Sequence, residues 1–508
     1  MTLLTVSCAK EDLTVIPPDS SVHQLPELVE GEYVEWNLAP EGKARLCCGK
    51  IDTAAVKGWK ICWYEIKDSA EVLIDGAINN YYDVEFVEKG IRNLKCKIFY
   101  TDIEKDSIEV KEYPYLVAYT GLPTLYIDTE NGQPIENKTD KKTAMLTLAG
   151  GGKFDDLNVS LEINGRGTTG WYGSPKKSYN LKFDSKAEVC GMSNSKKWAL
   201  RDNYHDRTLL RDRYVSWISQ NVFTNMGWQP SNINCDFVLN GEYKGCYVLT
   251  ERIKIEKNRL DIPNISDVED LTQGGFLCEI DERFDETYHF RTTHGVNHYN
   301  GKEGIAVCLK DPDEVDETTF EYVKNIVQTA ENALYSEDFS DENSGYAHYF
   351  DLDALVDWYL IHEYVCMYDA SSFYTSAYFY YNSSDNKLHM GPCWDFDTAL
   401  RRDVTSLELR EINSWYKRLF EDEKFRTLVK ERWNQKKQVL KQSLSKLDEM
   451  ADDIRVSADF NFKRWEVLGT PYDGQPTWDE LKSYQDQVEF LKDWATNRIV
   501  TMDENINK

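Results

Sequence analysis

The stretch GPCWDFD, residues 391–397, places two carboxylates two positions apart between aromatic residues. If the stretch forms a strand, alternate side chains share one face, so Asp395 and Asp397 point the same way. Two carboxylates on one face repel each other unless a positive group lies between them. Because hard divalent cations take oxygen ligands, the motif predicts a metal site. A solvated strand end is the alternative interpretation.

Composition sets the size and broad class of the protein. A chain of 508 residues exceeds the length at which a single core usually keeps growing, so we expect two or three domains. No apolar run reaches the roughly 18 residues that a membrane span requires. The formal charge of −28 argues against nucleic-acid binding, because phosphate backbones require a basic face. That charge favours a basic protein substrate or serves solubility alone.

The first residues end a short apolar run at Cys8, which resembles the lipobox of bacterial lipoproteins. The positive region that normally precedes such a run is missing, so we interpret residues 1–19 as a truncated leader and linker. The resemblance predicts an exported protein, anchored at the outer membrane or cell surface by a lipid on Cys8. The acidic residues that follow, Glu11 and Asp12, resemble the signal that sends some lipoproteins to the outer face.

The other eleven cysteines are scattered and include no C-x-x-C pair. Structural zinc sites need paired spacings, so the cysteine pattern argues against one. Most of these residues are expected to be small buried apolar side chains, and an exported protein could hold one or two disulfides.

Residues 20–119 carry short alternating strands, such as 59–64 and 94–100, separated by turn residues. No stretch of helical period interrupts them. This pattern predicts a small β-sandwich of immunoglobulin type. It could act as a spacer from the membrane or as a ligand-binding domain.

Residues 120–508 mix strands and helices, so we predict an α+β fold whose C-terminal part, from about 411, is helical. The expected strands are 125–128, 144–148, 159–164, 178–183, 235–239, 243–250, 373–381 and 387–390. The expected helices are 207–226, 349–364, 414–453 and 478–504. Asn240-Gly241 is a strong hairpin signal between two of these strands. Acid-rich segments 261–270 and 311–316 are predicted to be surface loops.

Gly165 to Gly170 reads GRGTTG and matches G-x-G-x-x-G. No helix is expected after it, because residues 175–183 read as another strand that carries lysines. This order argues against a dinucleotide site and matches the loop that covers ATP phosphates in protein kinases. Glycines let backbone amides approach phosphate closely, and lysine supplies a point charge. A flexible β-turn with solvated lysines is the alternative.

Two further acids occupy places where chemistry is expected. Glu251 ends a strand and could orient a phosphate-binding lysine, or it could be a surface acid. Asp369 follows the apolar helix 355–367, and an acid at the carbonyl end of a helix is electrostatically unfavourable. It could instead accept a proton from an attacking hydroxyl. The three nearby histidines fit no zinc spacing and are expected in loops; they are His289, His294 and His298.

From about Leu122 to its C-terminus the chain resembles the CotH family, named for a spore-coat protein with an atypical protein-kinase fold. The matching stretches occur in family order. They are 163–167 with 175–179, 198–200, 239–247 with Glu251, Asp369, and 391–397.

The resemblance implies transfer of phosphate from ATP to serine on a protein, with Mg²⁺ or Mn²⁺. Lys177 or Lys182 would contact phosphate and pair with Glu251. Asp369 would be the acid–base residue, Asp395 would hold the metal, and Asp397 could assist. The residues expected at the nucleotide are Gly165, Arg166, Gly167, Gly170, Lys177 and Lys182.

The chain also departs from the family pattern, since Met367 and Ser376 stand where the family often has asparagine. A catalytically inactive kinase-like lipoprotein, acting as a binding protein or adhesin, is therefore the second hypothesis. A two-carboxylate glycosidase is a more distant one. For the kinase we expect a basic, serine-rich protein substrate, no nucleic acid and a monomeric chain.

Overall fold

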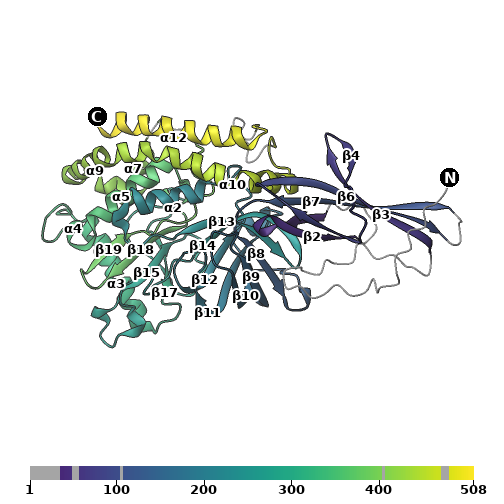
Figure 1. The fold of residues 1–508 in the computed structure, drawn as a ribbon. Coiled ribbons are helices and arrows are strands. Elements are labelled where there is room, and N and C mark those ends of the chain that lie inside the picture. Colours follow the sequence, from purple (N-terminus) through teal and green to yellow (C-terminus); the bar gives the residue numbers. More distant parts are fainter. Residues whose placement is uncertain (1–34, 49–55, 103–106, 403–404, 406, 471–479) are drawn as a thin grey trace.

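A computed structural model describes the chain except for residues 1–34, 49–55, 103–106, 403–404, 406 and 471–479. The molecule is elongated, with strands at one end, a barrel in the middle and most helices at the other end (Figure 1). Cys8 and the predicted leader lie outside the described residues. No described helix is both long and apolar enough to cross a membrane.

The first part of the chain forms two facing sheets. One has the order β1-β7-β6-β3-β4, and the other pairs β2 with β5. Their strands are β1 Glu35–Leu38, β2 Lys43–Cys47, β3 Val56–Lys67, β4 Ala70–Leu73, β5 Tyr81–Glu85, β6 Gly90–Asp102 and β7 Ile108–Tyr119. Their inward side chains, among them Trp63, Leu94 and Val84, are fully buried in one core. The alternating stretches 59–64 and 94–100 thus lie on strands β3 and β6, and the immunoglobulin type of this part stays a prediction.

The middle of the molecule is a closed barrel with the order β10-β11-β12-β14-β13-β8-β9. Its strands are β8 Thr124–Thr129, β9 Lys142–Ala149, β10 Leu157–Arg166, β11 Ser178–Ala187, β12 Ser195–Arg201, β13 Asn232–Leu239 and β14 Glu242–Glu251. Asn240-Gly241 turns the β13–β14 hairpin as predicted, with Asn240 and Gly241 at positive φ. Strand β12, which the sequence did not indicate, packs Trp198 and Leu200 into the barrel core.

A third sheet, of order β16-β17-β15-β18-β19, lies between the barrel and the helices (Figure 1). Its strands are β15 Phe276–Ile280, β16 His289–Arg291, β17 Ala306–Asp311, β18 Ala377–Asn382 and β19 Lys387–Met390. The β18–β19 hairpin was predicted, whereas β15 and β17 were not. Both unpredicted strands are buried on each face, so they lack the alternation that marks a half-buried strand.

The helices cover the third sheet and one side of the barrel. They are α1 Thr169–Gly173, α2 Arg211–Asn221, α3 Glu317–Tyr335, α4 Tyr346–Tyr349, α5 Leu352–Val365, α6 Tyr368–Ser371, α7 Leu409–Ile412, α8 Ser414–Leu419, α9 Glu423–Gln442, α10 Leu444–Arg464 and α12 Tyr484–Ile506. Short 3-10 turns occupy Pro40–Gly42, Glu130–Gly132, Thr224–Met226, Ile265–Asp267 and Leu271–Gln273. Helix α5 is buried all round and holds the core that underlies the site. The α+β prediction with a helical C-terminal part is confirmed.

Helix α10 reaches back along the molecule and joins the barrel to the sandwich (Figure 1). Phe460 on α10 packs against Trp36 of the sandwich and Tyr243 of the barrel, with ring centroids 5.1 Å and 4.6 Å away. Beside them Asp236 is fully buried on β13 and accepts hydrogen bonds from Thr120, Ser457 and Tyr243 at 2.6, 2.7 and 3.2 Å. This junction fixes the sandwich against the rest of the chain.

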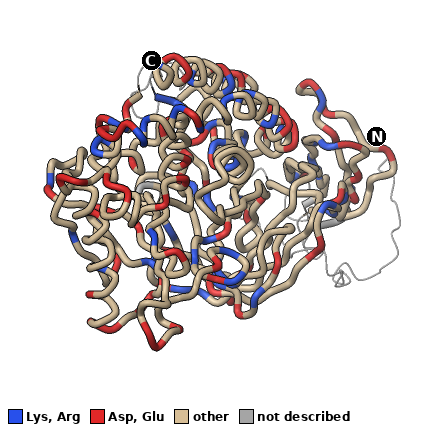
Figure 2. The backbone as a smooth tube through the Cα atoms, turned by 90° about the vertical axis from the view of Figure 1, so that its left-hand side faces the viewer, with Lys and Arg blue, Asp and Glu red and all other residues tan. Residues whose placement is uncertain are grey.

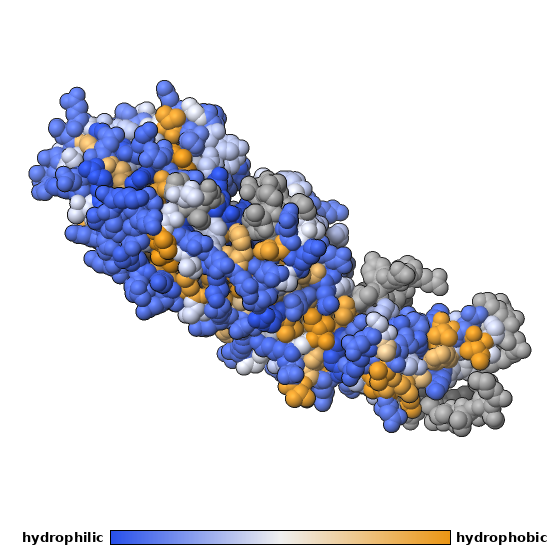
Figure 3. Space-filling model, turned by 90° about the horizontal axis from the view of Figure 1, so that it is seen from above, coloured by the Kyte–Doolittle hydropathy of each residue, from blue (hydrophilic) through white to orange (hydrophobic). Residues whose placement is uncertain are grey.

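Charged and apolar side chains are distributed differently over the surface. Figure 2 shows acidic residues spread over the whole view and interspersed with basic ones rather than gathered in one place. Figure 3 shows apolar side chains exposed on the sandwich. They include Trp59, Leu73, Ile78, Ile108 and Val110. The charge of −28 therefore does not come from one acidic docking surface.

Candidate active site

The stretch 391–397 follows β19 and forms no regular secondary structure, so the predicted strand is wrong. Its backbone amides find side-chain acceptors: Cys393 donates to Gln229 and Phe396 donates to Asp212, both at 2.8 Å. Asp395 lies in the left-handed region with φ 70°. The tertiary contacts satisfy the amides that a neighbouring strand would otherwise pair.

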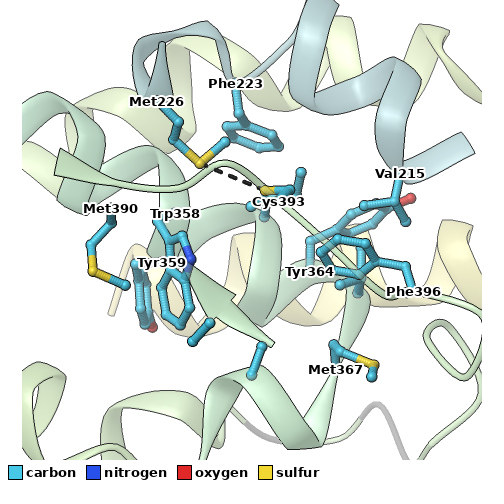
Figure 4. Close-up of a cluster of buried hydrophobic side chains, with 14 of the residues drawn as sticks. Val215, Phe223, Met226, Trp358, Tyr359, Tyr364, Met367, Met390, Cys393 and Phe396 are labelled. Atoms are coloured by element: carbon cyan, nitrogen blue, oxygen red, sulfur yellow. Dashed lines mark hydrogen bonds between the residues drawn. The ribbon is translucent and has the colours of Figure 1, made fainter. Parts of the chain in front are cut away.

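Cys393 and Phe396 anchor this loop by burial. Figure 4 shows both side chains within a buried cluster that includes Val215 from α2 and Trp358 and Tyr364 from α5. They are 5% and 3% exposed. Because these two side chains point into the core, the backbone must twist between them, and the two acids point toward the barrel. The loop is therefore held rigidly enough to position its carboxylates.

The positive group between the two acids is an arginine from the barrel. Arg201, at the end of β12, contacts Asp395 at 2.5 Å and Asp212 on α2 at 2.6 Å, and lies 3.9 Å from Asp397. Its side chain is only 8% exposed. Burial strengthens such ion pairs and also makes any unpaired partner costly. The cation that the sequence argument required is thus partly supplied by the protein itself.

One arginine does not balance all the carboxylates at this point. Burial and the neighbouring Asp395 raise the pKa of Asp397 well above its ordinary value, and burial raises the pKa of Asp212. The side chains of Asp395 and Asp397 are 41% and 26% exposed, so both reach solvent. A further cation at this point would relieve the electrostatic imbalance.

The donor set fits a divalent ion of a particular kind. Within the described residues, no group of three acidic, histidine or cysteine side chains lies close enough to hold a metal alone. Mg²⁺ commonly takes one or two carboxylates and completes its shell with water and substrate phosphates. Asp395 and Asp397 are suited to that arrangement, in which the remaining ligands come from a nucleotide.

Asp369 precedes β18 and Asp395 follows β19, so both lie at the open end of the antiparallel β18–β19 hairpin. It belongs to α6, directly after α5, and is half-buried. Burial and the nearby Asp395 raise its pKa, against the opposing effect of Arg283 and Arg402. The structure therefore brings together the predicted base and the predicted metal ligand. A raised pKa suits a carboxylate that takes up a proton during reaction.

The two positions that depart from the family pattern have different environments. Met367 is 3% exposed and packs in the core, where Thr398 contacts its sulfur at 3.4 Å. Ser376 lies at the site, with its hydroxyl 3.4 Å from Asp395 and its amide donating to Glu279. Ser376 is therefore placed where a metal ligand was expected, and Met367 is not.

The glycine loop begins at the end of β10 and is packed rather than open. A methyl group on Gly165 would lie 2.5 Å from the ring of Trp171, and Gly167 has φ +83°. The short helix α1 follows, although no helix was predicted there. Arg166 extends from the loop over the ring of Trp394, 5.3 Å from its centroid. The loop thus contributes an arginine beside Asp395.

Arg283 joins the glycine loop to the third sheet. Its guanidinium pairs with Asp281 at 2.7 Å and donates to Thr375 at 2.6 Å and Thr168 at 3.4 Å. Because Thr168 belongs to the loop and Thr375 precedes β18, this side chain links the two segments close to Asp369.

The structure does not bring the predicted lysines to Glu251. Lys177 donates to two carbonyls of its own loop, those of Trp171 and Ser174, both at 2.5 Å. Lys182 is 52% exposed and pairs with Glu162 on the outside of the barrel. Glu251 is buried and accepts from the amides of Ser193 and Ser231 at 2.7 and 2.8 Å. In the described part of the chain, no ion pair joins Glu251 to a lysine.

Arg201 and Asp212 occupy the places that the sequence argument gave to a lysine and Glu251. A strand cation paired with an acid on the following helix is the arrangement by which protein kinases hold ATP phosphates. The sequence prediction included Trp198-Ala199-Leu200 but not Arg201, the next residue. The available signal was the dense alternation of charge over residues 201–212, inside an otherwise buried segment.

Comparison with known proteins adds one result to this geometry. A family model described as CotH kinase protein matches residues 163–502. The matched region contains the glycine loop, Arg201, Asp212, Asp369, Asp395 and Asp397. No curated protein matches the chain.

Proposed function

Since the chain belongs to the CotH kinase family, we propose that it transfers the terminal phosphoryl group of ATP to a serine hydroxyl of another protein. The observation that supports this best is the set formed by Arg201, Asp212 and Asp395. It joins a barrel strand, the helix that follows it and the loop after the β18–β19 hairpin. Asp369 precedes that hairpin and lies at the same open end as Asp395.

Each side chain has a role that follows from its position. Asp369 accepts the proton of the attacking hydroxyl, because it is a half-buried carboxylate near the metal-binding acids. Arg201, kept in place by Asp212, neutralises phosphate charge next to Asp395. Arg166 approaches the same region from the glycine loop.

Asp395 and Asp397 would hold Mg²⁺ or Mn²⁺, with Ser376 beside them. When bound, the ion neutralises charge on the transferring phosphate. The protein's own contribution is to keep the two carboxylates on a loop anchored by buried side chains. Phosphoryl transfer depends mainly on positioning and charge neutralisation, so this small set of residues is sufficient.

We also propose where the protein acts and on what. The resemblance of the first residues to a lipobox supports an exported, surface-anchored lipoprotein, with a lipid on Cys8. The charge of −28 supports a basic, serine-rich acceptor protein. The sandwich would then hold the kinase part away from the membrane as a spacer in a monomeric chain.

Calorimetric titration of ATP with Mg²⁺ or Mn²⁺ tests the nucleotide site. We expect metal-dependent binding in the native chain and its loss in Asp395→Ala. Lys182→Ala serves as the matched control, because Lys182 lies on the outer face of the barrel. Absence of binding with either metal, in protein shown to be folded, would refute the kinase proposal and favour the inactive binding protein.

A further inference from the structure

A second group of charges lies next to the acids described above, between the barrel and the third sheet. It lines a cavity of about 50 Å³, which we call the basic pocket. Its lining residues are Arg166, Lys197, Arg252, Ile253, Lys254, Lys310, Asp311, Asp313, Tyr378 and Trp394. Five of these carry positive charge and two carry negative charge. The chain as a whole has a net charge of −28, so this excess of cations is a local feature of the pocket.

Three of the five cations have acidic partners. Lys197 lies 3.1 Å from Asp313, and Lys254 lies 3.9 Å from both Asp311 and Asp313. Lys310 pairs with Glu279 at 3.2 Å and also with Glu286. These contacts hold the lysines at the wall of the pocket, and Asp313 is shared between two of them.

The two arginines are not neutralised by carboxylate contacts in the described structure. Arg252 donates to the neutral side chain of Asn180 at 3.0 Å. Arg166 stacks on Trp394, and no described residue forms a hydrogen bond or ion pair with its guanidinium. Burial, together with Arg252 and Arg201, lowers the pKa of Arg166 to about 10. Like charges brought together in this way favour binding of an anion.

The basic pocket is continuous with the acid cluster through Trp394. The guanidinium of Arg166 lies 5.3 Å from this ring and that of Arg201 lies 5.7 Å from it. Trp394 directly precedes Asp395 in the chain. An anion in the pocket therefore ends within reach of the groups that would bind a metal and transfer a phosphoryl group.

We propose that the basic pocket binds the polyphosphate chain of the donor nucleotide, through Arg166, Arg252 and Lys254. The inference rests on the proposed function for the identity of the donor, but its chemistry, recognition of a multiply charged phosphate anion, does not. It replaces the expected phosphate contacts of Lys177 and Lys182 with side chains that the fold brings together from β10 and the segment after β14. Arg252 and Lys254 become specificity residues for a polyphosphate.

Titration of the full chain with inorganic triphosphate, in buffer with EDTA and no divalent metal, tests the pocket directly. We expect binding that weakens as KCl is raised, because the contacts are ionic. The double variant Arg252→Gln/Lys254→Gln should lower the affinity for triphosphate at least tenfold. Lys182→Gln should leave the affinity unchanged, and Asp395→Ala should not lower it. Circular dichroism and thermal melting check that each variant is folded.

The outcomes separate this inference from the proposed function. No triphosphate binding by the native chain, or equal binding by the Arg252→Gln/Lys254→Gln variant, would overturn the pocket assignment even if ATP and metal still bind through Asp395. Triphosphate that binds in the pocket but is not displaced by ATP would show an anion site separate from the donor, which also overturns the proposal. Displacement by ATP without phosphoryl transfer would confirm the pocket and refute the kinase activity.

Discussion

Arg201 and Asp395, 194 positions apart in the chain, meet at 2.5 Å where the barrel faces the helical part of the molecule. Asp212 holds the same guanidinium from the other side at 2.6 Å. The contact joins three elements that are separate in sequence, and each of them ends at the site. A substitution that breaks this contact should therefore affect both the stability of the fold and the proposed activity.

Removing the arginine alone should destabilise the protein strongly. Arg201→Gln leaves Asp212, which is 3% exposed, without its cation, and an unpaired buried charge costs about 3–5 kcal/mol. The double variant Arg201→Gln/Asp212→Asn should recover part of this loss while nucleotide binding stays lost. Urea denaturation measures the stability of each variant. Arg45→Gln is the matched control, since the Arg45–Asp83 pair is on the surface and contributes at most about 1 kcal/mol. An equal loss in the control and in Arg201→Gln would contradict the buried role.

Asp369→Asn should leave ATP binding intact and remove transfer. Loss of a general base lowers kcat by about 10²–10⁴-fold. Among the described residues the Asp369 carboxylate forms no hydrogen bond or ion pair that the change would break, and it loses only the attraction of Arg283 and Arg402. Transfer of labelled phosphate to a serine-rich acceptor measures the rate, and calorimetry measures binding. In the native chain, the raised pKa of Asp369 predicts that the rate falls as the pH is lowered through that value, at a pH above the usual value of about 3.9 for aspartate. A variant that keeps full activity would assign the base elsewhere.

Asp236 should make stability depend on pH. Its pKa is raised to about 6 because it is buried, so the folded chain binds the proton more tightly than the unfolded chain does. Stability from this group is therefore present below the ordinary aspartate value and is lost as the pH rises through about 6. Relative to Asp236→Asn, the native chain should gain on the order of 2 kcal/mol when the pH is lowered from 7 to about 4.5. Urea midpoints across this range test the sign, and parallel curves for both proteins would refute it.

Gly165→Ala should displace Trp171 and loosen the glycine loop. A methyl group there would lie 2.5 Å from the indole ring, and such overpacking costs about 1–3 kcal/mol. Because Arg166 follows directly, nucleotide affinity should fall as well. Thermal melting and Trp fluorescence report the change. Gly58→Ala on β3 is the control, since nothing lies within 4 Å of its added methyl group. A variant with unchanged melting and affinity would show that the ring moves aside freely.

Local pattern predicted most of the elements that border solvent on one side. The alternating strands of the sandwich, the Asn240-Gly241 hairpin and the helices after residue 411 followed from spacing and turn chemistry. The pattern failed for β15, β17 and the Trp198–Arg201 part of β12, where consecutive residues are buried and show no alternation. It also failed for 391–397, where core contacts from Cys393 and Phe396 outweigh strand propensity.

By itself, the sequence determined the α+β class and the elements of strong local periodicity, and it singled out Asp369, Asp395 and Asp397 as candidate acids for chemistry. These follow from local periodicity and from charges standing in apolar surroundings, which the chain displays within a few residues. Only the tertiary structure decided which cation contacts the acids, and it is Arg201 rather than Lys177 or Lys182. The tertiary structure also decided that Glu251 accepts hydrogen bonds from two backbone amides. Ion pairing requires contact within a few ångströms, and the partner is set by barrel closure and helix packing rather than by spacing along the chain.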